Sequence, residues 1–285
     1  MQHLLHKFCR RYCHPVVVLP GLLLLLLSGC GGSKYEERVA RTSQFYDYLT
    51  SMNASLSPAW IRRDLGLSMR PPFPFKSPMS GPPVQKDQLG KEVIGLDPRQ
   101  ETPLGVPLPG LEEAWAGNLD TSKMEPDIWM YVLTNHSRLK EEADGGRPAN
   151  EFLIDLEREL MSVFQVTIPD GETSQPKDNI RYKAKIPSPS SPSANYTTPQ
   201  DFSVIHFVGE LPVQDQELSG LLYARRVDKT QVAILVILPK DAPLAFRQRL
   251  ELALATLSVD NVAVSRKNSG SSRQPGAPGK AAPNF

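Results

Sequence analysis

Cysteine is nearly absent from this chain of 285 residues. Its three cysteines, Cys9, Cys13 and Cys30, all lie within the first 30 residues, and none follows. The chain after residue 30 therefore cannot form a disulfide framework, a cysteine-ligated zinc site or a cysteine nucleophile.

The chain also lacks a strong excess of positive charge. It has 32 Lys and Arg residues against 31 Asp and Glu residues, and residues 1–29 hold three of the basic residues and none of the acidic ones. Without those three, 29 basic residues face 31 acidic ones, a formal charge of about −2. Nucleic-acid binding depends on clustered cations that neutralise phosphates. We therefore expect no nucleic acid among its partners.

Motifs for common chemistry are missing as well. The sequence has no glycine-rich phosphate loop, no HExxH zinc motif and no calcium-binding loop. Only two histidines, His136 and His206, follow residue 14. His206 lies among apolar residues of a predicted strand, where a core or edge histidine is the common state, and His136 lies in a polar turn. We therefore expect neither a metal site nor a cofactor.

Short patterns that resemble catalytic motifs do not form sets. Residues 137–140 and 174–177 both have the Ser-x-x-Lys spacing of some acyl-transfer enzymes, but the companion motifs of that class are missing. Asp155, Glu157 and Glu159 alternate within a predicted helix, and a spacing of two places them on different faces. We expect no catalytic residues and lean toward a protein that is not an enzyme. The open alternative is a set of carboxylates that converge from distant segments.

The first 29 residues have the organisation of a signal peptide. Lys7, Arg10 and Arg11 give a positive start, and residues 16–27 form an apolar run that ends in six leucines. About 12 residues in a helix cannot span a hydrocarbon core of about 30 Å. An apolar run of this length with small residues behind it predicts a removable signal rather than a transmembrane helix.

Residues 27–30, Leu-Ser-Gly-Cys, resemble the bacterial lipobox of leucine, two small residues and cysteine. The resemblance implies that a diacylglycerol is attached to the Cys30 thiol, that cleavage falls between Gly29 and Cys30, and that the new amine is acylated. Two or three acyl chains hold a protein durably on a membrane, whereas one chain holds it only marginally. The alternative is an ordinary secretory signal with an incidental cysteine.

A lipid on Cys30 would place the protein outside the cytoplasm. We expect residues 30–34 to form the lipidated terminus and a short flexible leash. Residue 31 is glycine rather than aspartate, and by resemblance to proteobacterial sorting rules this favours release from the inner membrane. The expected location is extracytoplasmic and membrane-anchored, at the periplasmic face or the outer membrane.

Two segments precede the best-patterned region. Apolar residues recur at helical spacing over residues 35–57, which predicts a helix. Residues 58–126 hold 12 prolines, which predicts an irregular or polyproline-like arm or linker. This arm is either a solvated stalk or a segment packed on the domain, and its aromatic residues favour partial packing. Those aromatic residues are Trp60, Phe73, Phe75 and Trp115.

Residues 127–267 carry the strongest patterns and predict a domain. Residues 232–238 are apolar at every position, which indicates a central strand with both faces covered. The order of the elements predicts an α+β fold in which a mostly antiparallel sheet is covered by two helices. We expect an exposed loop at 187–199 and a disordered tail at 268–285. The predicted strands cover 127–134, 180–186, 202–208, 218–227 and 231–238, and the helices begin near 150 and 241.

Four features taken together resemble uncharacterised lipoproteins of planctomycete-type bacteria. They are the lipobox, Tyr-Glu-Glu-Arg-Val at 35–39, the arginine and proline motif at 69–75, and Leu-Pro-Gly-Leu at 108–111. The resemblance covers most of the chain and implies no known activity. The small sheet with a long C-terminal helix is also similar to extracytoplasmic lipoproteins with a PsbP-like fold, an analogy of fold alone.

These observations favour a lipid-anchored, non-enzymatic interaction or scaffold protein of the cell envelope. Its expected partners are the membrane, through lipid on Cys30, and a protein of the envelope. The alternative is an extracytoplasmic small-ligand-binding lipoprotein, suggested by the exposed loop beside a two-layer core. A hydrolase ranks third, since it would need a cleft that brings His136 or His206 against carboxylates.

Overall fold

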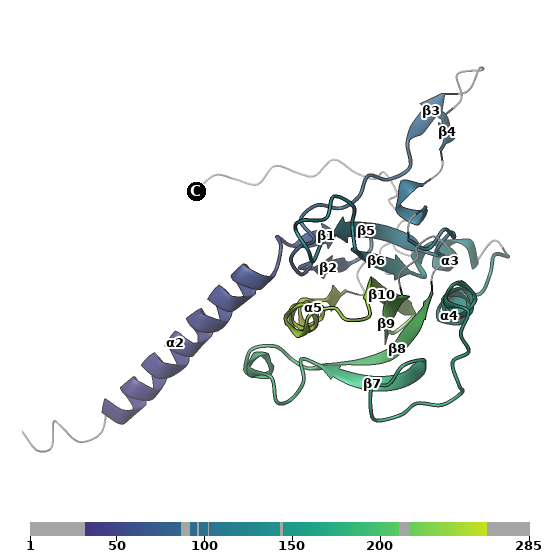
Figure 1. The fold of residues 1–285 in the computed structure, drawn as a ribbon. Coiled ribbons are helices and arrows are strands. Elements are labelled where there is room, and N and C mark those ends of the chain that lie inside the picture. Colours follow the sequence, from purple (N-terminus) through teal and green to yellow (C-terminus); the bar gives the residue numbers. More distant parts are fainter. Residues whose placement is uncertain are drawn as a thin grey trace, which may run out of the picture. The chain divides into compact units, whose positions relative to one another are not determined.

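The computed structural model describes residues 32–86, 92–95, 97–101, 103–142, 145–210 and 217–260 (Figure 1). The expected signal peptide, with Gly29 and Cys30, and the expected tail at 268–285 lie outside these residues. The chain divides into two compact units, Met1–Met52 and Asn53–Phe285.

The described part of the first unit is helical. Helix α2 (Gly32–Ser55) has 24 residues and continues to the start of the second unit. Its Glu37 and Arg41 form an ion pair of 2.5 Å at a spacing of four residues, a pairing that supports a helix. The helix begins at Gly32, so most of the leash expected at 30–34 is helical. Within the described residues, no helix combines the length and apolar character needed to cross a membrane.

A six-stranded sheet forms the centre of the second unit, and its strands lie in the order β5-β6-β10-β9-β8-β7. All five neighbouring pairs are antiparallel. Its members are β5 (Leu111–Gly117), β6 (Ile128–Thr134), β7 (Ile180–Ile186), β8 (Gln200–Glu210), β9 (Glu217–Val227) and β10 (Thr230–Pro239).

The centre of this sheet follows from local sequence. Strand β10 is buried at every residue, because β6 and β9 flank it and both of its faces are covered. It follows β9 after the two-residue turn Asp228-Lys229, and Asp228 has a φ of +51°. Positive φ in a two-residue turn matches the twist of a hairpin, and aspartate tolerates that conformation well.

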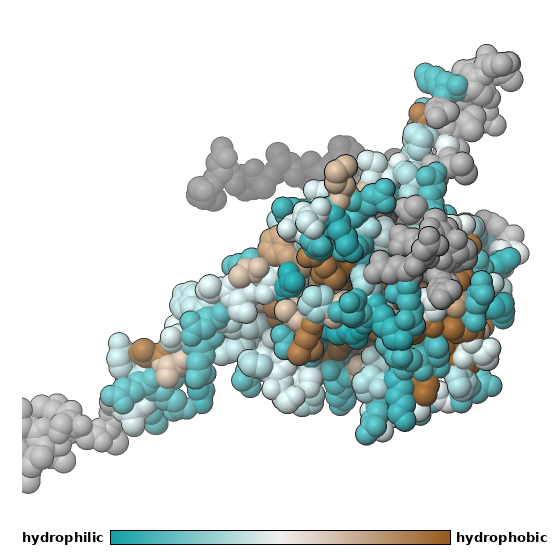
Figure 2. Space-filling view, viewed as in Figure 1, coloured by the Kyte–Doolittle hydropathy of each residue, from teal (hydrophilic) through white to brown (hydrophobic). Residues whose placement is uncertain are grey.

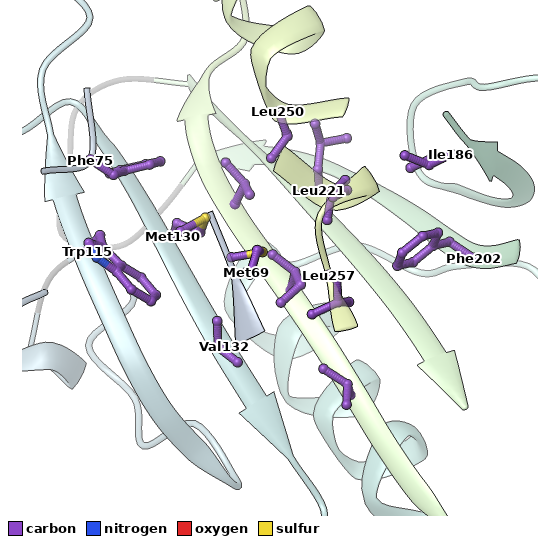
Figure 3. Close-up of a cluster of buried hydrophobic side chains, with 14 of the residues drawn as sticks. Met69, Phe75, Trp115, Met130, Val132, Ile186, Phe202, Leu221, Leu250 and Leu257 are labelled. Carbon is purple, nitrogen blue, oxygen red and sulfur yellow. The ribbon is translucent and has the colours of Figure 1, made fainter. Parts of the chain in front are cut away.

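Each face of the sheet has its own apolar layer. Helix α4 (Phe152–Phe164) packs on one face through Phe152, Leu156 and Leu160, all fully buried. Helix α5 (Leu244–Ala255) packs on the other face, where side chains from α5, β2, β5 and β6 converge (Figure 3). The α+β class with antiparallel pairing is thus confirmed.

The cover over the sheet differs from the two helices expected. A second, three-stranded sheet lies beside α5, with β2 (Leu67–Met69) between β1 (Trp60–Arg62) and β11 (Ser258–Val259). The described residues also include helix α3 (His136–Glu141) and the hairpin of β3 (Val84–Lys86) and β4 (Glu92–Ile94). Short 3₁₀ helices cover Pro98–Gln100, Ala149–Glu151 and Pro192–Asn195.

The proline-rich segment at 58–126 is not a separate irregular arm. Strands β1, β2 and β5 come from it, and the domain boundary expected at residue 127 falls between the paired strands β5 and β6. Phe75 and Trp115 are 0% and 1% exposed, and both lie in the core under α5. The prolines limit the strands to short runs, while the apolar residues between them still reach the core.

Candidate functional site

The structure brings His206 between a serine and a carboxylate. His206 Nε2 lies 2.5 Å from Ser219 Oγ, and His206 Nδ1 lies 3.3 Å from Asp178 Oδ1. Since Nδ1 faces the carboxylate, the ring holds its proton there and Nε2 accepts from the serine hydroxyl. This is the connectivity of a Ser-His-Asp catalytic triad. The sequence indicated neither Ser219 nor Asp178.

The burial of Ser219 argues against attack on a substrate. Ser219 lies on the central part of the sheet, next to β8, and is 0% exposed. A nucleophile must be reachable by the carbon atom that it attacks, whereas the Asp178 side chain is the exposed end of this set at 58%. The contacts instead supply hydrogen-bond partners to a buried hydroxyl and a half-buried imidazole. Burial also lowers the pKa of His206, and the nearby Arg247 lowers it further, while Asp178 acts in the opposite direction.

A second polar group lies on the same face of the sheet, under α5. Tyr182 of β7 and Tyr223 of β9 both lie opposite Val204 of β8, which places the two tyrosines in one row across three strands. Burial raises the pKa of both tyrosines, and the positive charge of Arg247 on α5 acts against this rise. We call Arg247, Tyr182 and Tyr223 the Arg247 cluster.

The Arg247 cluster contains hydrogen-bond donors that are not used. In the part of the chain that the structure describes, the Arg247 guanidinium makes no ion pair or hydrogen bond, and neither tyrosine hydroxyl has a hydrogen-bond partner. Glu251, one turn further along α5, accepts the backbone N–H of Ser188 at 2.8 Å. A half-buried guanidinium without a partner is an arrangement suited to a carboxylate or phosphate.

His136, the other candidate from the sequence, lies at the start of α3. Its backbone N–H donates to Thr134 Oγ1 at 3.2 Å, and Thr134 Oγ1 donates to Glu112 Oε1 at 2.8 Å. Burial lowers the pKa of His136 first and Lys140 lowers it further, while Glu112 and Asp64 act to raise it. The imidazole thus lies near two carboxylates without a direct contact to either among the printed sequence's described residues.

The carboxylates near His136 belong to ion pairs. Arg62 lies 2.8 Å from Asp64 Oδ2 and 3.7 Å from Glu112 Oε2. Arg99 lies 2.6 Å from Asp97 Oδ2 and 3.7 Å from Glu113 Oε1. Each acid is thereby matched by an arginine, which favours the charged form and removes it as a general acid. Across the described ranges, no group of three or more metal-ligating side chains is assembled.

The remaining patterns from the sequence have structural roles. Asp155 pairs with Arg138 at 2.8 Å, and that contact lowers the pKa of Asp155. Glu157 accepts from Arg181 of β7, so it does not work together with Asp155. Among the hydrogen bonds of the described chain, none joins Ser137 to Lys140 or Ser174 to Lys177.

Helix α2 presents apolar side chains to solvent. Tyr35 is 70% exposed, Tyr46 63%, Val39 49% and Phe45 42%. Figure 2 shows hydrophobic residues on this helix among hydrophilic ones. Exposed apolar residues that are grouped in this way mark interaction surfaces more often than those that are scattered. The group begins five residues after Cys30, the expected lipidation site, which lies outside the described residues.

Comparison with known proteins adds no family. No family model matches the chain, and no curated protein matches its sequence. The functional argument therefore rests on the residues themselves.

Proposed function

We propose that this protein is a lipid-anchored interaction protein of the cell envelope that acts without catalysis. In this proposal lipid on Cys30 holds the chain at an extracytoplasmic membrane surface, and α2 supplies a contact surface next to the membrane. The observation that carries the proposal is the exposed apolar group on α2, with Tyr35 and Tyr46 at 70% and 63% exposure.

The position of these residues favours recognition over an accident of composition. Exposing a large aromatic side chain gives up the free energy of its burial, of the order of 1.5–3 kcal/mol for a full side chain. The second unit buries its own large aromatics, including Phe75, Phe164 and Phe246, so the same chain does place such residues in a core. A partner that covers α2 would recover the free energy lost there.

Affinity capture from solubilised membranes tests the proposal. The bait is the full lipidated chain, compared with a double variant, Val39→Ser with Tyr46→Ser, which removes apolar surface from α2 and leaves the second unit untouched. We expect one or more proteins, including further copies of the chain itself, to be captured by the wild type and lost with the double variant. Equal capture by both baits, or capture of nothing specific, would count against the proposal.

A second function, binding of a small anionic ligand, is favoured by the Arg247 cluster. Its unused guanidinium and two tyrosine hydroxyls are donors that a carboxylate or phosphate would satisfy together. The cluster packs against the core under α5, where Tyr182 and Tyr223 are partly buried. Partial burial strengthens an ion pair relative to bulk water.

A thermal-shift screen of small mono- and dicarboxylates and phosphates tests this second function. A binding anion should raise the melting temperature of the wild type and leave that of Arg247→Leu unchanged. Arg249→Leu is the matched control, because Arg249 lies on the same helix and contacts Phe246 and the backbone of Ala245. If no anion stabilises the wild type over Arg247→Leu, the cluster has no such ligand.

A further inference from the structure

We propose that α2 pairs with α2 of a second copy of this chain as a parallel two-stranded coiled coil on the membrane. This inference rests on the proposed function, and it names the partner of the α2 surface. Residues spaced alternately by four and three along a helix form one stripe that faces a partner helix. In α2 that spacing selects Tyr35, Val39, Thr42, Tyr46 and Leu49, which we call the α2 stripe.

The α2 stripe is a seam without a cover. Tyr35, Val39 and Tyr46 are exposed at 70%, 49% and 63%. The stripe ends at Leu49, because the next position, Asn53, accepts a hydrogen bond from Arg70 at 2.9 Å and so belongs to the second unit. A helix of this length is marginal in water unless its apolar face is packed. A partner helix therefore stabilises α2 as well as covering it.

The charges on α2 argue against the membrane surface as the cover. The helix carries Lys34, Arg38 and Arg41 against Glu36, Glu37 and Asp47, so it is neutral in sum. Helices that lie in the membrane interface have a polar face rich in Lys and Arg, which is attracted to anionic lipids. No such face exists on α2, whereas a balanced polar face suits a helix pair surrounded by water.

The chain length between the anchor and the helix argues for a second copy in parallel. Only residue 31 separates Cys30 from the first residue of α2 at Gly32. Two lipidated copies in one membrane would therefore start their helices at the same height above the lipid. Parallel helices that start at one height lie in register, so each stripe residue faces its own counterpart.

The size of the surface predicts an association that depends on the anchor. A large aromatic residue removes roughly 150–250 Å² from water when fully buried. Two partly exposed tyrosines with Val39 and Phe45 therefore give on the order of 600–900 Å² for both helices, below the 1,200 Å² typical of stable complexes. Confinement to one membrane raises the effective concentration without adding a contact. Pairing should thus be strong on vesicles and weak in solution.

Disulfide crosslinking on vesicles tests the pairing. Lipidation would convert the Cys30 thiol to a thioether, so Thr42→Cys and Gln44→Cys would each leave one free thiol in the mature chain. Thr42 lies on the α2 stripe and Gln44 lies on the opposite side of the helix. With purified lipidated protein on phosphatidylcholine vesicles under mild oxidation, we expect Thr42→Cys to form dimers at least tenfold faster than Gln44→Cys. Adding Tyr46→Ser to Thr42→Cys should remove that difference.

Other covers for the stripe give different results, and each would overturn the inference. Equal crosslinking rates would show random collision of tethered copies. Loss of maleimide labelling at Thr42→Cys on vesicles, without crosslinking, would show that lipid covers the stripe. The same loss in a soluble Cys30→Ser form that remains monomeric would show that the chain covers its own helix. Vesicle flotation of each sample reports the anchor separately, and capture of another protein through α2 would leave the proposed function standing.

Discussion

Replacing Phe75 with alanine tests whether the proline-rich segment is part of the folded domain. Phe75 is 0% exposed, and its ring meets Phe246 of α5 edge to face at a centroid distance of 6.1 Å. Its carbonyl also accepts a hydrogen bond of 2.5 Å from the buried Ser57 hydroxyl. Truncating a buried phenylalanine removes its burial and leaves a cavity, which costs about 3–5 kcal/mol. A segment lying loosely on the surface would show almost no cost.

The size of this effect is large against the whole stability of a domain. Total unfolding free energies are about 5–15 kcal/mol, so the variant should lose a third or more of its stability. For a unit of about 200 residues, this corresponds to a fall in melting temperature of roughly 6–15 °C. Urea unfolding followed by tryptophan fluorescence would measure it, since Trp115 lies in the same core as Phe75.

Phe73 provides the matched control for this experiment. It lies two residues earlier in the same proline-rich run and is only partly buried. Phe73→Ala should therefore cost about 1 kcal/mol or less, in line with its smaller buried area. If Phe75→Ala costs no more than Phe73→Ala, the packing described for this segment is wrong.

Three further perturbations test other parts of the structure. Cys30→Ser should leave the melting temperature of the second unit unchanged but move the protein from the membrane fraction to the soluble fraction; full retention on membranes would refute the lipid anchor. Burial holds the pKa of His206 below its ordinary value of about 6.5, so its contribution to stability is present above that pH and is lost as the pH falls below it. Wild type should accordingly lose more stability between pH 7.5 and pH 5 than His206→Gln does, measured by urea unfolding at each pH; equal losses would contradict this. Gly110→Ala should cost about 3 kcal/mol or more in thermal unfolding, because Gly110 has a φ of +65° and a Cβ there would lie 1.9 Å from a backbone oxygen, while Gly171→Ala, with a φ of +107° and open space, should cost only about 1–2 kcal/mol.

The parts of the fold that could be predicted are those with a local signature. The apolar run of β10 and the hairpin that joins it to β9 depend on residues adjacent in sequence, and both stand as expected. The stripe on α4 repeats at helical spacing and is buried as expected. Periodicity reports these elements because each reflects one exposed and one buried direction along a short stretch of chain.

The second sheet could not be predicted, for physical reasons. Strands β1 and β2 have three residues each and β11 has two, too few to show alternation. Ser68 of β2 pairs with Ser258 of β11, far away along the chain. Such a pairing is selected by the closure of the whole domain and not by the residues around it.

The polar groups of the site were missed for the same reason. His206 was recognised, but its partners Ser219 and Asp178 are identified only by the register of β8 on β9 and by the loop before β7. The Arg247 cluster combines residues from two strands and one helix, which no motif in the sequence connects. The exposed face of α2 was visible as a helical pattern, but its lack of cover was not.

The pairing of β2 with β11 also bears on the time at which the domain can close during synthesis. Residues 67–69 leave the ribosome or an export channel long before residues 258–259. Until the later residues arrive, Leu67 and Met69, which end at 2% and 1% exposure, have no neighbouring strand on that side and no finished core beneath them. The hydrogen bond from the Arg70 backbone to Thr256, 186 residues further on, has the same delay. A chain delivered start first would thus remain open until nearly all of it has emerged, and would need a chaperone that shields residues 67–69 during that wait.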